Sequence, residues 1–273
     1  MAKLKIGLVG CGAIGSSLAA RIVRDFSGRA RLVALYDLAF SKASRLSFTV
    51  CKSSRLVAAT LKELIGRSDL VIEAASAQSA WQVAQSVLGQ GKDILIMSVG
   101  GIAPHYASLV RLANNKHARV FIPSGAISGI DALKAARFGK IKEVMLTTRK
   151  SPQSFAGVAY LTQSKVDLKS IQKDTVLYCG TARRAIRLFP QNINVAALLS
   201  IAGIGLDRTK VKIIASPLAR SNIHEIKVTS EAGTVLTRTE NVVHPDNPKT
   251  SYLAVLAAVA TLQQILDPVK IGT

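Results

Sequence analysis

Apolar and polar positions along the first half of the chain follow two alternating patterns. Short apolar runs typical of buried strands cover residues 5–9, 31–36, 69–75, 93–99 and 119–123. Between some of them apolar residues recur with helical spacing, most clearly over 79–88 and 106–114. Repeated strand–helix units of this length predict an α/β fold with a doubly wound parallel sheet, which binds ligands at the carboxyl ends of its strands.

The pattern changes near residue 140. Residues 143–148, 225–229 and 234–239 alternate like half-exposed strands. Apolar helical patterns then cover 194–202 and 250–266. The second half therefore predicts an α+β domain built on an open mixed sheet, and the last helix is expected to pack back on the first domain.

The turn after the first strand reads Gly10-Cys11-Gly12-Ala13-Ile14-Gly15. In a dinucleotide-binding turn, Gly10 permits the tight turn, Gly12 lets the backbone approach a pyrophosphate, and Gly15 lets the helix pack close to the strand. The free N–H groups and the positive end of the helix dipole then face the phosphates. We therefore predict a Rossmann-type domain over 1–135 and a substrate domain over 136–249. A glycine-rich turn of some other α/β protein is the alternative.

Asp37 ends the second strand, about one βαβ unit after the glycines, where a carboxylate accepts hydrogen bonds from the adenosine ribose. Its alternative role is to cap a turn. A carboxylate here repels a 2′-phosphate and favours NAD, whereas Lys42 is close enough in sequence to soften that repulsion and leaves NADP open. Small residues around Ala75, at the end of the third strand, leave room for a nicotinamide. The residues predicted to bind the cofactor from this part of the chain are Gly10, Gly12, Ala13, Ile14, Gly15, Asp37 and Ala75.

The chain carries 36 basic and 16 acidic residues, a formal net charge of +20. The excess is dispersed along the chain, with no run of five or six basic residues. Aromatic content is only 5%, so a solvated basic surface is favoured over nucleic-acid contact, and no specific nucleic-acid partner is expected. The positive field should attract anionic ligands such as dinucleotides and dicarboxylates.

The three cysteines, Cys11, Cys51 and Cys179, have no metal-ligand spacing. They indicate a reduced cytoplasmic compartment and no metal site. We interpret Cys11, inside the glycine turn, as a packing residue rather than a nucleophile. No apolar run reaches the roughly 20 residues that span a bilayer, and the N-terminal residues do not resemble a secretory signal.

Four histidines are candidate acid–base groups, because imidazole titrates near neutral pH. His117 has the polar neighbours of an exposed surface. His105 follows Pro104 at a predicted helix start, where capping or exposure is the expected role. His224 lies at the entry to a strand and His244 in a rigid polar turn, and their spacing does not choose between them.

Four segments together resemble the L-aspartate dehydrogenase family: 123–133 (PSGAISGIDAL), 189–197 (FPQNINVAA), 222–226 (NIHEI) and 247–253 (NPKTSYL). The resemblance covers essentially the whole chain in order. It implies NAD(P)-dependent oxidative deamination of L-aspartate to iminoaspartate, and the reverse amination. The iminoaspartate would hydrolyse to oxaloacetate and ammonia or feed NAD biosynthesis. By matching motifs, Ala126 and Asn194 fall on cofactor-contacting positions and His224 on the active-site histidine.

The proposed chemistry assigns further roles. His224 would assist proton loss from the aspartate ammonium or activate the water that attacks the imine. Two substrate carboxylates need cationic or N–H partners, and Lys249 is the candidate, with Thr250 and His244 in the same turn. Asn192 and Asn194 precede an apolar helix, so the competing role for one of them is the N-cap. A homodimer is expected, with the apolar residues 251–266 contributing.

Two further interpretations stay open from the sequence. Reductases of the dihydrodipicolinate or homoserine dehydrogenase type share this two-domain layout. A protein that binds NAD(P) without turnover, or a nucleic-acid-associated protein with a vestigial dinucleotide site, would belong to a different class.

Overall fold

The computed structural model describes residues 2–189, 194–244 and 247–272, without the side chains of residues 244 and 247–250. It divides into two compact units. The first contains Met1–Pro123 and Val255–Lys270, and the second contains Ser124–Ala254 and Ile271–Thr273. No helix among the described residues is long and apolar enough to cross a membrane.

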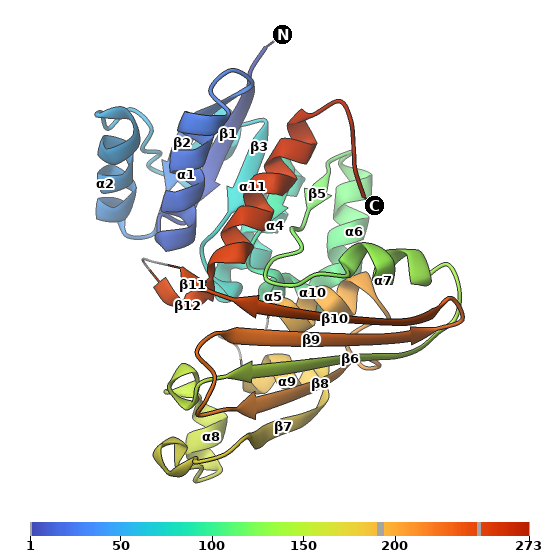
Figure 1. Cartoon of the computed structure of the whole chain (residues 1–273). Helices are drawn as coiled ribbons and strands as arrows, with labels where there is room; N and C mark the ends of the chain where they lie inside the picture. The colour runs from blue at the N-terminus through green and yellow to red at the C-terminus, as the bar shows by residue number, and fades with distance from the viewer. Residues whose placement is uncertain (1, 190–193, 245–246, 273) are drawn as a thin grey trace. The chain divides into compact units, whose positions relative to one another are not determined.

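The first unit is built on a parallel sheet with the strand order β2-β1-β3-β4-β5 (Figure 1). Its strands are β1 (Leu4–Val9), β2 (Ala30–Tyr36), β3 (Leu70–Glu73), β4 (Asp93–Ile96) and β5 (Val120–Phe121). Strand order reverses between β1 and β3, so their carboxyl ends border the switch point where such sheets bind ligands. The predicted doubly wound sheet is confirmed, although β3, β4 and β5 are shorter than their apolar runs.

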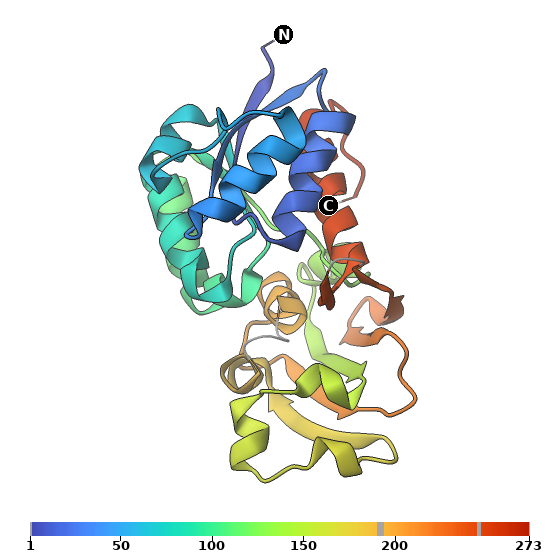
Figure 2. The same cartoon turned by 90° about the vertical axis from the view of Figure 1, so that its left-hand side faces the viewer.

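Helices cover both faces of this sheet. They are α1 (Ala13–Asp25), α2 (Phe40–Cys51), α3 (Leu61–Arg67), α4 (Ala77–Gly89), α5 (Val99–Ile102), α6 (Tyr106–Asn115) and α11 (Tyr252–Leu266), with a 3₁₀ turn at Ala103–His105. α1 and α11 lie on one face, and α4 and α6 lie on the other (Figures 1 and 2). Val255, Ala258 and Leu262 of α11 belong to the same buried cluster as Leu8 and Leu18.

The last helix begins two residues later than its apolar pattern predicts. Residues 247–251 form β12 (Asn247–Ser251), which pairs antiparallel with β11 (Val243–His244). The Tyr252 N–H also donates to the Val242 carbonyl at 2.9 Å. This pairing keeps residues 250 and 251 extended, so α11 starts at Tyr252.

The second unit is built on a mixed sheet with the strand order β10-β9-β6-β8-β7. Its strands are β6 (Ile141–Lys150), β7 (Thr175–Thr181), β8 (Lys210–Ala215), β9 (Asn222–Ser230) and β10 (Gly233–Asn241). β6 and β8 are parallel, and the other neighbours are antiparallel. The predicted open mixed sheet is therefore confirmed, but β7 and β8 were not expected from the sequence.

Short helices complete the second unit. They are α7 (Ile130–Ala136), α8 (Ala159–Gln163), α9 (Ala182–Leu188) and α10 (Asn194–Ala202), with 3₁₀ turns at Pro152–Phe155 and Leu168–Ser170. α9 and α10 lie on one face of the sheet (Figure 2). The hydrophobic core beneath them includes Val144 and Leu146 of β6 and Ile226 and Val228 of β9.

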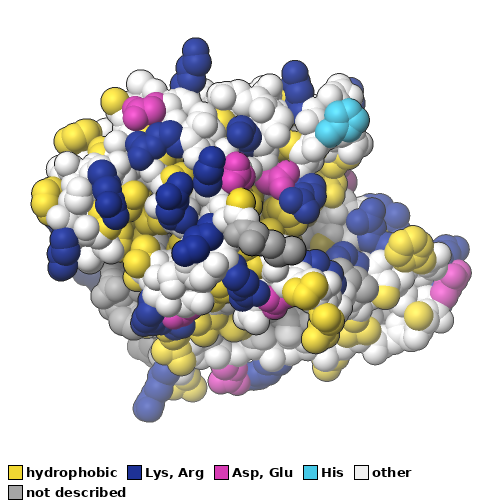
Figure 3. Space-filling model, turned by 90° about the horizontal axis from the view of Figure 1, so that it is seen from above, with side chains coloured by type: hydrophobic (Ala, Val, Ile, Leu, Met, Phe, Trp, Pro, Cys, Tyr) yellow, Lys and Arg dark blue, Asp and Glu magenta, His cyan; other side chains and the backbone are white. Residues whose placement is uncertain are grey.

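Basic side chains are spread over the surface rather than gathered in one strip, as Figure 3 shows for one face. A cavity of about 830 Å³ in the first unit is lined by apolar and basic side chains. The basic ones are Lys3, Lys5, Arg31, Arg55 and Arg67. None of the residues predicted to bind cofactor or substrate lines this cavity. The candidate site is therefore defined by backbone geometry and buried polar groups, not by this hollow.

Candidate active site

The glycine turn has the geometry that a dinucleotide requires. Gly10 has a φ of +93°, and a Cβ there would lie 2.5 Å from the Ala74 carbonyl oxygen. A Cβ on Gly15 would lie 1.9 Å from the Gly10 carbonyl oxygen, so only glycine permits this contact. A Cβ on Gly12 would meet nothing within 4 Å. Open space at Gly12, between two tightly packed glycines, fits the approach of a pyrophosphate.

The start of α1 adds to this cradle. Gly12 is the N-cap residue and makes no side-chain cap, and the first turn contains no acidic residue. The N–H groups of that turn are thus left for another acceptor, and the helix dipole favours a negative charge there. Residues Ala13 and Ile14, predicted as cofactor contacts, are the first two residues of this turn.

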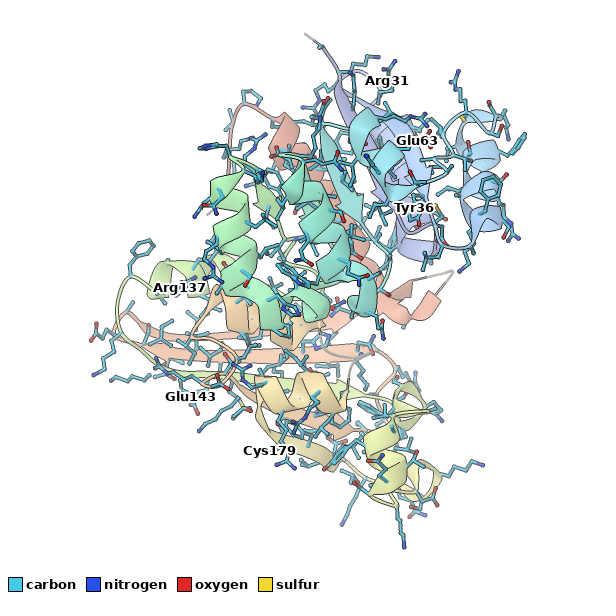
Figure 4. The ribbon with its side chains drawn as sticks, turned by 180° about the vertical axis from the view of Figure 1, so that it is seen from behind. Arg31, Tyr36, Glu63, Arg137, Glu143 and Cys179 are labelled. Atoms are coloured by element: carbon cyan, nitrogen blue, oxygen red, sulfur yellow. The ribbon has the colours of Figure 1, made fainter. Side chains whose placement is uncertain are left out.

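Asp37 is fixed at the same turn. Its Oδ2 accepts a hydrogen bond from the Cys11 N–H and its Oδ1 from the Ala39 N–H, both at 2.8 Å. It directly follows Tyr36, the last residue of β2, which is labelled in Figure 4. Each carboxylate oxygen keeps further acceptor capacity for a ribose hydroxyl. Both roles weighed from the sequence, turn capping and ribose binding, are therefore compatible.

Cys11, whose N–H donates to the Asp37 carboxylate, has a buried thiol. Burial, with the negative charge of Asp37 as the second cause, raises the pKa of the Cys11 thiol to about 12. The thiol is therefore protonated at neutral pH and is a poor nucleophile. The positive charge of Lys42 acts in the opposite direction on the same thiol, which places Lys42 near the turn.

Glu73 is a buried acid beside the predicted cofactor contact Ala75, and it was not identified from the sequence. It ends β3 and is completely buried. Its Oε1 accepts hydrogen bonds from the Ala75 N–H at 2.9 Å and the Ser98 hydroxyl at 2.9 Å, and its Oε2 accepts one from the Ser98 N–H at 3.0 Å. Burial raises the pKa of this carboxyl group. Glu73 thereby ties the loop that contains Ala75 to the loop after β4, and an acid inside an apolar run was the available signal.

In the second unit, His224 is buried with 4% of its surface exposed. Its Nδ1 lies 3.0 Å from the Thr148 hydroxyl oxygen, and the two residues stand opposite each other on β9 and β6. Burial, followed by the positive charge of Lys150, lowers the pKa of His224 to about 3. The imidazole is therefore neutral at pH 7. Thr148 and Lys150 were not identified from the sequence.

Ala126 is held by the edge strand β10. Its carbonyl oxygen accepts hydrogen bonds from Asn241 Nδ2 at 2.9 Å and from the Thr239 hydroxyl at 3.1 Å. Thr239 stands opposite His224 in the β9–β10 pairing, and Asn241 stands opposite Asn222. Ala126 and His224, two predicted site residues far apart in sequence, are thus connected through one strand.

The other predicted residues are placed less fully. Asn194 is the first residue of α10 and is exposed, while Asn192 lies outside the described residues. His244, Lys249 and Thr250 lie on β11 and β12, and their side chains lie outside what the structure describes. Their predicted roles in substrate binding stay predictions.

Two histidines have structural surroundings. The ring of His105 stacks on Trp81, with ring centroids 4.8 Å apart and an interplanar angle of 10°. His117 is exposed and has a φ of +51°. Neither stands on the sheet that carries His224.

These features define an NAD(P)-dependent dehydrogenase of the two-domain type. One unit has a glycine cradle with an acid directly after β2, and the other carries a buried, neutral imidazole on a mixed sheet. The family model "Homoserine dehydrogenase, NAD binding domain" matches residues 10–123, and "Aspartate dehydrogenase, C-terminal" matches residues 131–265.

Full-length relatives narrow this class. The chain is 43% identical to the L-aspartate dehydrogenase of Methanosarcina barkeri and 44% identical to that of Methanococcoides burtonii, in each case over 99% of this chain and 100% of the relative. The fold matches the crystal structure of aspartate dehydrogenase from Thermotoga maritima with a TM-score of 0.74 at 24% identity, covering 99% of this chain and 100% of that one. The chain belongs to the L-aspartate dehydrogenase family.

Proposed function

We propose that this chain catalyses the NAD(P)-dependent oxidative deamination of L-aspartate to iminoaspartate, and the reverse amination. The observation that carries the proposal is the buried, neutral His224, which lies in the part of the chain matched by the aspartate dehydrogenase C-terminal model. The curated relatives named L-aspartate dehydrogenase over their full length support the choice of substrate. The homoserine and dihydrodipicolinate alternatives share the fold but lack this support.

His224 is the proposed proton acceptor. The ammonium group of aspartate must lose a proton before hydride can leave Cα, and a neutral imidazole can take that proton. The hydrogen bond with Thr148 fixes the orientation of the ring. Bound NAD(P) supplies the hydride acceptor. Once this proton has passed to solvent, the same imidazole, neutral again, can activate the water that hydrolyses the imine to oxaloacetate and ammonia.

The cofactor is proposed to bind at the glycine turn, with Ala126 and Asn194 as further contacts. Asp37 favours NAD, because its carboxylate can accept hydrogen bonds from the ribose hydroxyls and repels a 2′-phosphate. Lys42 lies close enough to the turn to act on Cys11, so NADP is a second substrate of the same site.

The cellular setting is also a proposal. All three cysteines are free, which is consistent with a reducing cytoplasm. On α11 only one stripe, Val255, Ala258 and Leu262, is buried, and Leu253 is 41% exposed, which leaves apolar surface for a homodimer contact. The iminoaspartate would serve NAD biosynthesis or be hydrolysed. Light scattering of the purified chain tests the dimer.

The decisive experiment follows absorbance at 340 nm with L-aspartate, D-aspartate, L-glutamate and L-alanine, each with NAD and with NADP. We expect turnover with L-aspartate and little with the other three amino acids. Homoserine and a cyclic imine, added to the panel, test the alternative enzymes. NADH binding without turnover on any of these substrates would contradict the proposal and favour a nucleotide sensor.

A further inference from the structure

The buried face of the second unit's sheet changes from apolar to polar along its strands. Its buried positions are Val144, Leu146, Thr148 and Lys150 on β6, and Val228, Ile226, His224 and Asn222 on β9. Because β6 and β9 are antiparallel with Thr148 opposite His224, the polar ends of both strands coincide. Burying polar and charged groups costs folding free energy, so an apolar sheet end would be more stable, and the polar end calls for a function.

Lys150 provides a positive charge at this polar end. The residue is only 7% exposed. Its backbone is held at the end of β6, where its carbonyl oxygen accepts a hydrogen bond from the Ser216 N–H at 2.9 Å. Its charge acts on the His224 ring, so ammonium and imidazole share one environment of low dielectric. Burial lowers the pKa of Lys150 to about 8, which leaves the amine mostly protonated at pH 7.

We propose that Lys150 binds one carboxylate of the dicarboxylate substrate beside His224. The inference rests on the proposed function, because it needs a diacid whose reacting carbon lies at the imidazole. A carboxylate is a natural partner for a buried ammonium group, since charge-assisted hydrogen bonds are about twice as strong as neutral ones.

Nearby arginines on the same sheet face away from His224. Side chains alternate between the two faces of a strand, so Arg149 points to the face opposite Lys150. Arg149 pairs with Glu225 and, at 3.4 Å, with Asp174. Arg238 pairs with Glu225 at 3.2 Å and with Glu240 at 2.6 Å. These arginines lie on the far side of the sheet from His224, whereas Lys150 is, among the described residues of β6 and β9, the buried cation on the face of His224.

The arrangement would couple substrate binding to acid–base chemistry. Burial and, as the second cause, the positive charge of Lys150 lower the pKa of His224. A substrate carboxylate at Lys150 offsets part of that charge, so the imidazole becomes a better proton acceptor once substrate is bound. One contact would then both hold the diacid and prepare the base.

The test compares Lys150→Met with Lys150→Arg and with a control, Lys227→Met, in the full chain. Lys227 lies on β9 and is exposed, so it carries the same charge on the opposite face. We would measure KM and kcat for L-aspartate, and by calorimetry the dissociation constant of succinate, a diacid without an amino group, with NADH present. NADH affinity from its own fluorescence serves as the folding control.

Lys150→Met should weaken both L-aspartate (as KM) and succinate by about ten- to hundredfold, the effect of losing one hydrogen bond to a charged group. Lys150→Arg, which keeps the charge, should recover part of the loss, and Lys227→Met should change neither value. If Lys150→Met does not fold, the test is the succinate affinity of Lys150→Arg compared with wild type. A changed affinity supports the proposal, and an unchanged affinity contradicts it.

A Lys150→Met variant that folds and keeps both constants within about threefold of wild type would overturn the proposal, as would a fall in kcat with unchanged succinate binding. These results are distinct from failure of the proposed function, which would appear as a wild-type chain without activity on L-aspartate.

Discussion

The two units build their sites in opposite ways. In the first unit the proposed site is made of backbone: Gly10, Gly12 and Gly15 shape a cradle, and Asp37 is the main side chain at it. In the second unit the proposed site is made of side chains from two strands, with Thr148 and Lys150 on β6 and His224 on β9. A backbone site tolerates almost no substitution at its glycines, whereas a side-chain site can be taken apart one group at a time.

The largest effect is expected at His224. His224→Ala should lower turnover of L-aspartate by roughly two to four orders of magnitude, the usual contribution of general acid–base catalysis. NADH binding should persist, because the glycine cradle is untouched. Steady-state kinetics and an NADH fluorescence titration measure the two quantities. His117→Ala, at an exposed histidine, is the control, and near-full turnover of His224→Ala would remove this residue from the mechanism.

The glycines of the cradle should separate folding from binding. Gly15→Ala places a Cβ 1.9 Å from the Gly10 carbonyl oxygen, and we expect about 3 kcal/mol or more of lost stability from this overpacking. A Cβ at Gly12 meets nothing within 4 Å, so Gly12→Ala should lose far less stability than Gly15→Ala, with only the small cost of alanine at an N-cap, while NADH binds at least about tenfold more weakly, or about 1.4 kcal/mol. Equal loss of stability in both variants would show that Gly12 is not reserved for a ligand.

A smaller effect, on cofactor preference, is expected at Asp37, the acidic residue at the glycine cradle. Asp37→Ala should lower kcat/KM for NAD by about ten- to hundredfold, since a hydrogen bond to a charged group contributes about 1.5–3 kcal/mol. The value for NADP should stay or rise, because the repulsion of its 2′-phosphate is removed. Michaelis constants for both cofactors measure the change. Equal preference for the two cofactors in the wild type would defeat the carboxylate argument.

The smallest effect concerns stability at acid pH. Burial lowers the pKa of His224 to about 3 in the folded chain, against about 6.5 when unfolded. The unfolded chain therefore takes up the proton first, and stability falls as pH drops from about 6.5 to about 3. His224→Asn keeps an amide near the position of Nδ1 but does not titrate. Urea unfolding should show wild type losing about 1.2 kcal/mol more than this variant between pH 6 and pH 5; parallel losses would contradict a neutral buried imidazole.

The same contrast explains what the sequence could predict. The glycine turn and Asp37 lie in a contiguous strand–turn–helix–strand stretch, so their roles follow from spacing, and the parallel sheet of the first unit follows from apolar runs. Thr148 lies 76 positions from its partner His224, so no local pattern joins them, and only the resemblance to a family selected His224.

Other misses also have physical causes. β8 carries Lys210 and Lys212 among its apolar residues, and β7 lies at the edge of the sheet, where its burial pattern does not alternate cleanly. Residue 250 was placed in the last helix because its sequence neighbours are apolar on the C-terminal side, whereas pairing with β11 keeps it extended. Glu73 was interpreted only as part of a buried strand. The sequence does not show that backbone N–H groups of Ala75 and Ser98 donate hydrogen bonds to its carboxylate.

The three cysteine thiols differ in exposure, so one of them can be labelled selectively with a dye. Cys11 is sealed and protonated, and Cys51 is half-buried with its sulfur near the Ser47 carbonyl oxygen at 3.1 Å, whereas Cys179 is exposed on β7 (Figure 4). A maleimide dye should therefore attach first at Cys179 and leave the cofactor turn intact. Trp81, the single tryptophan of the chain, lies in the first unit. Energy transfer from that indole to a dye on Cys179 would follow, in real time and without any engineered cysteine, whether adding NADH or a diacid changes the separation of the two units.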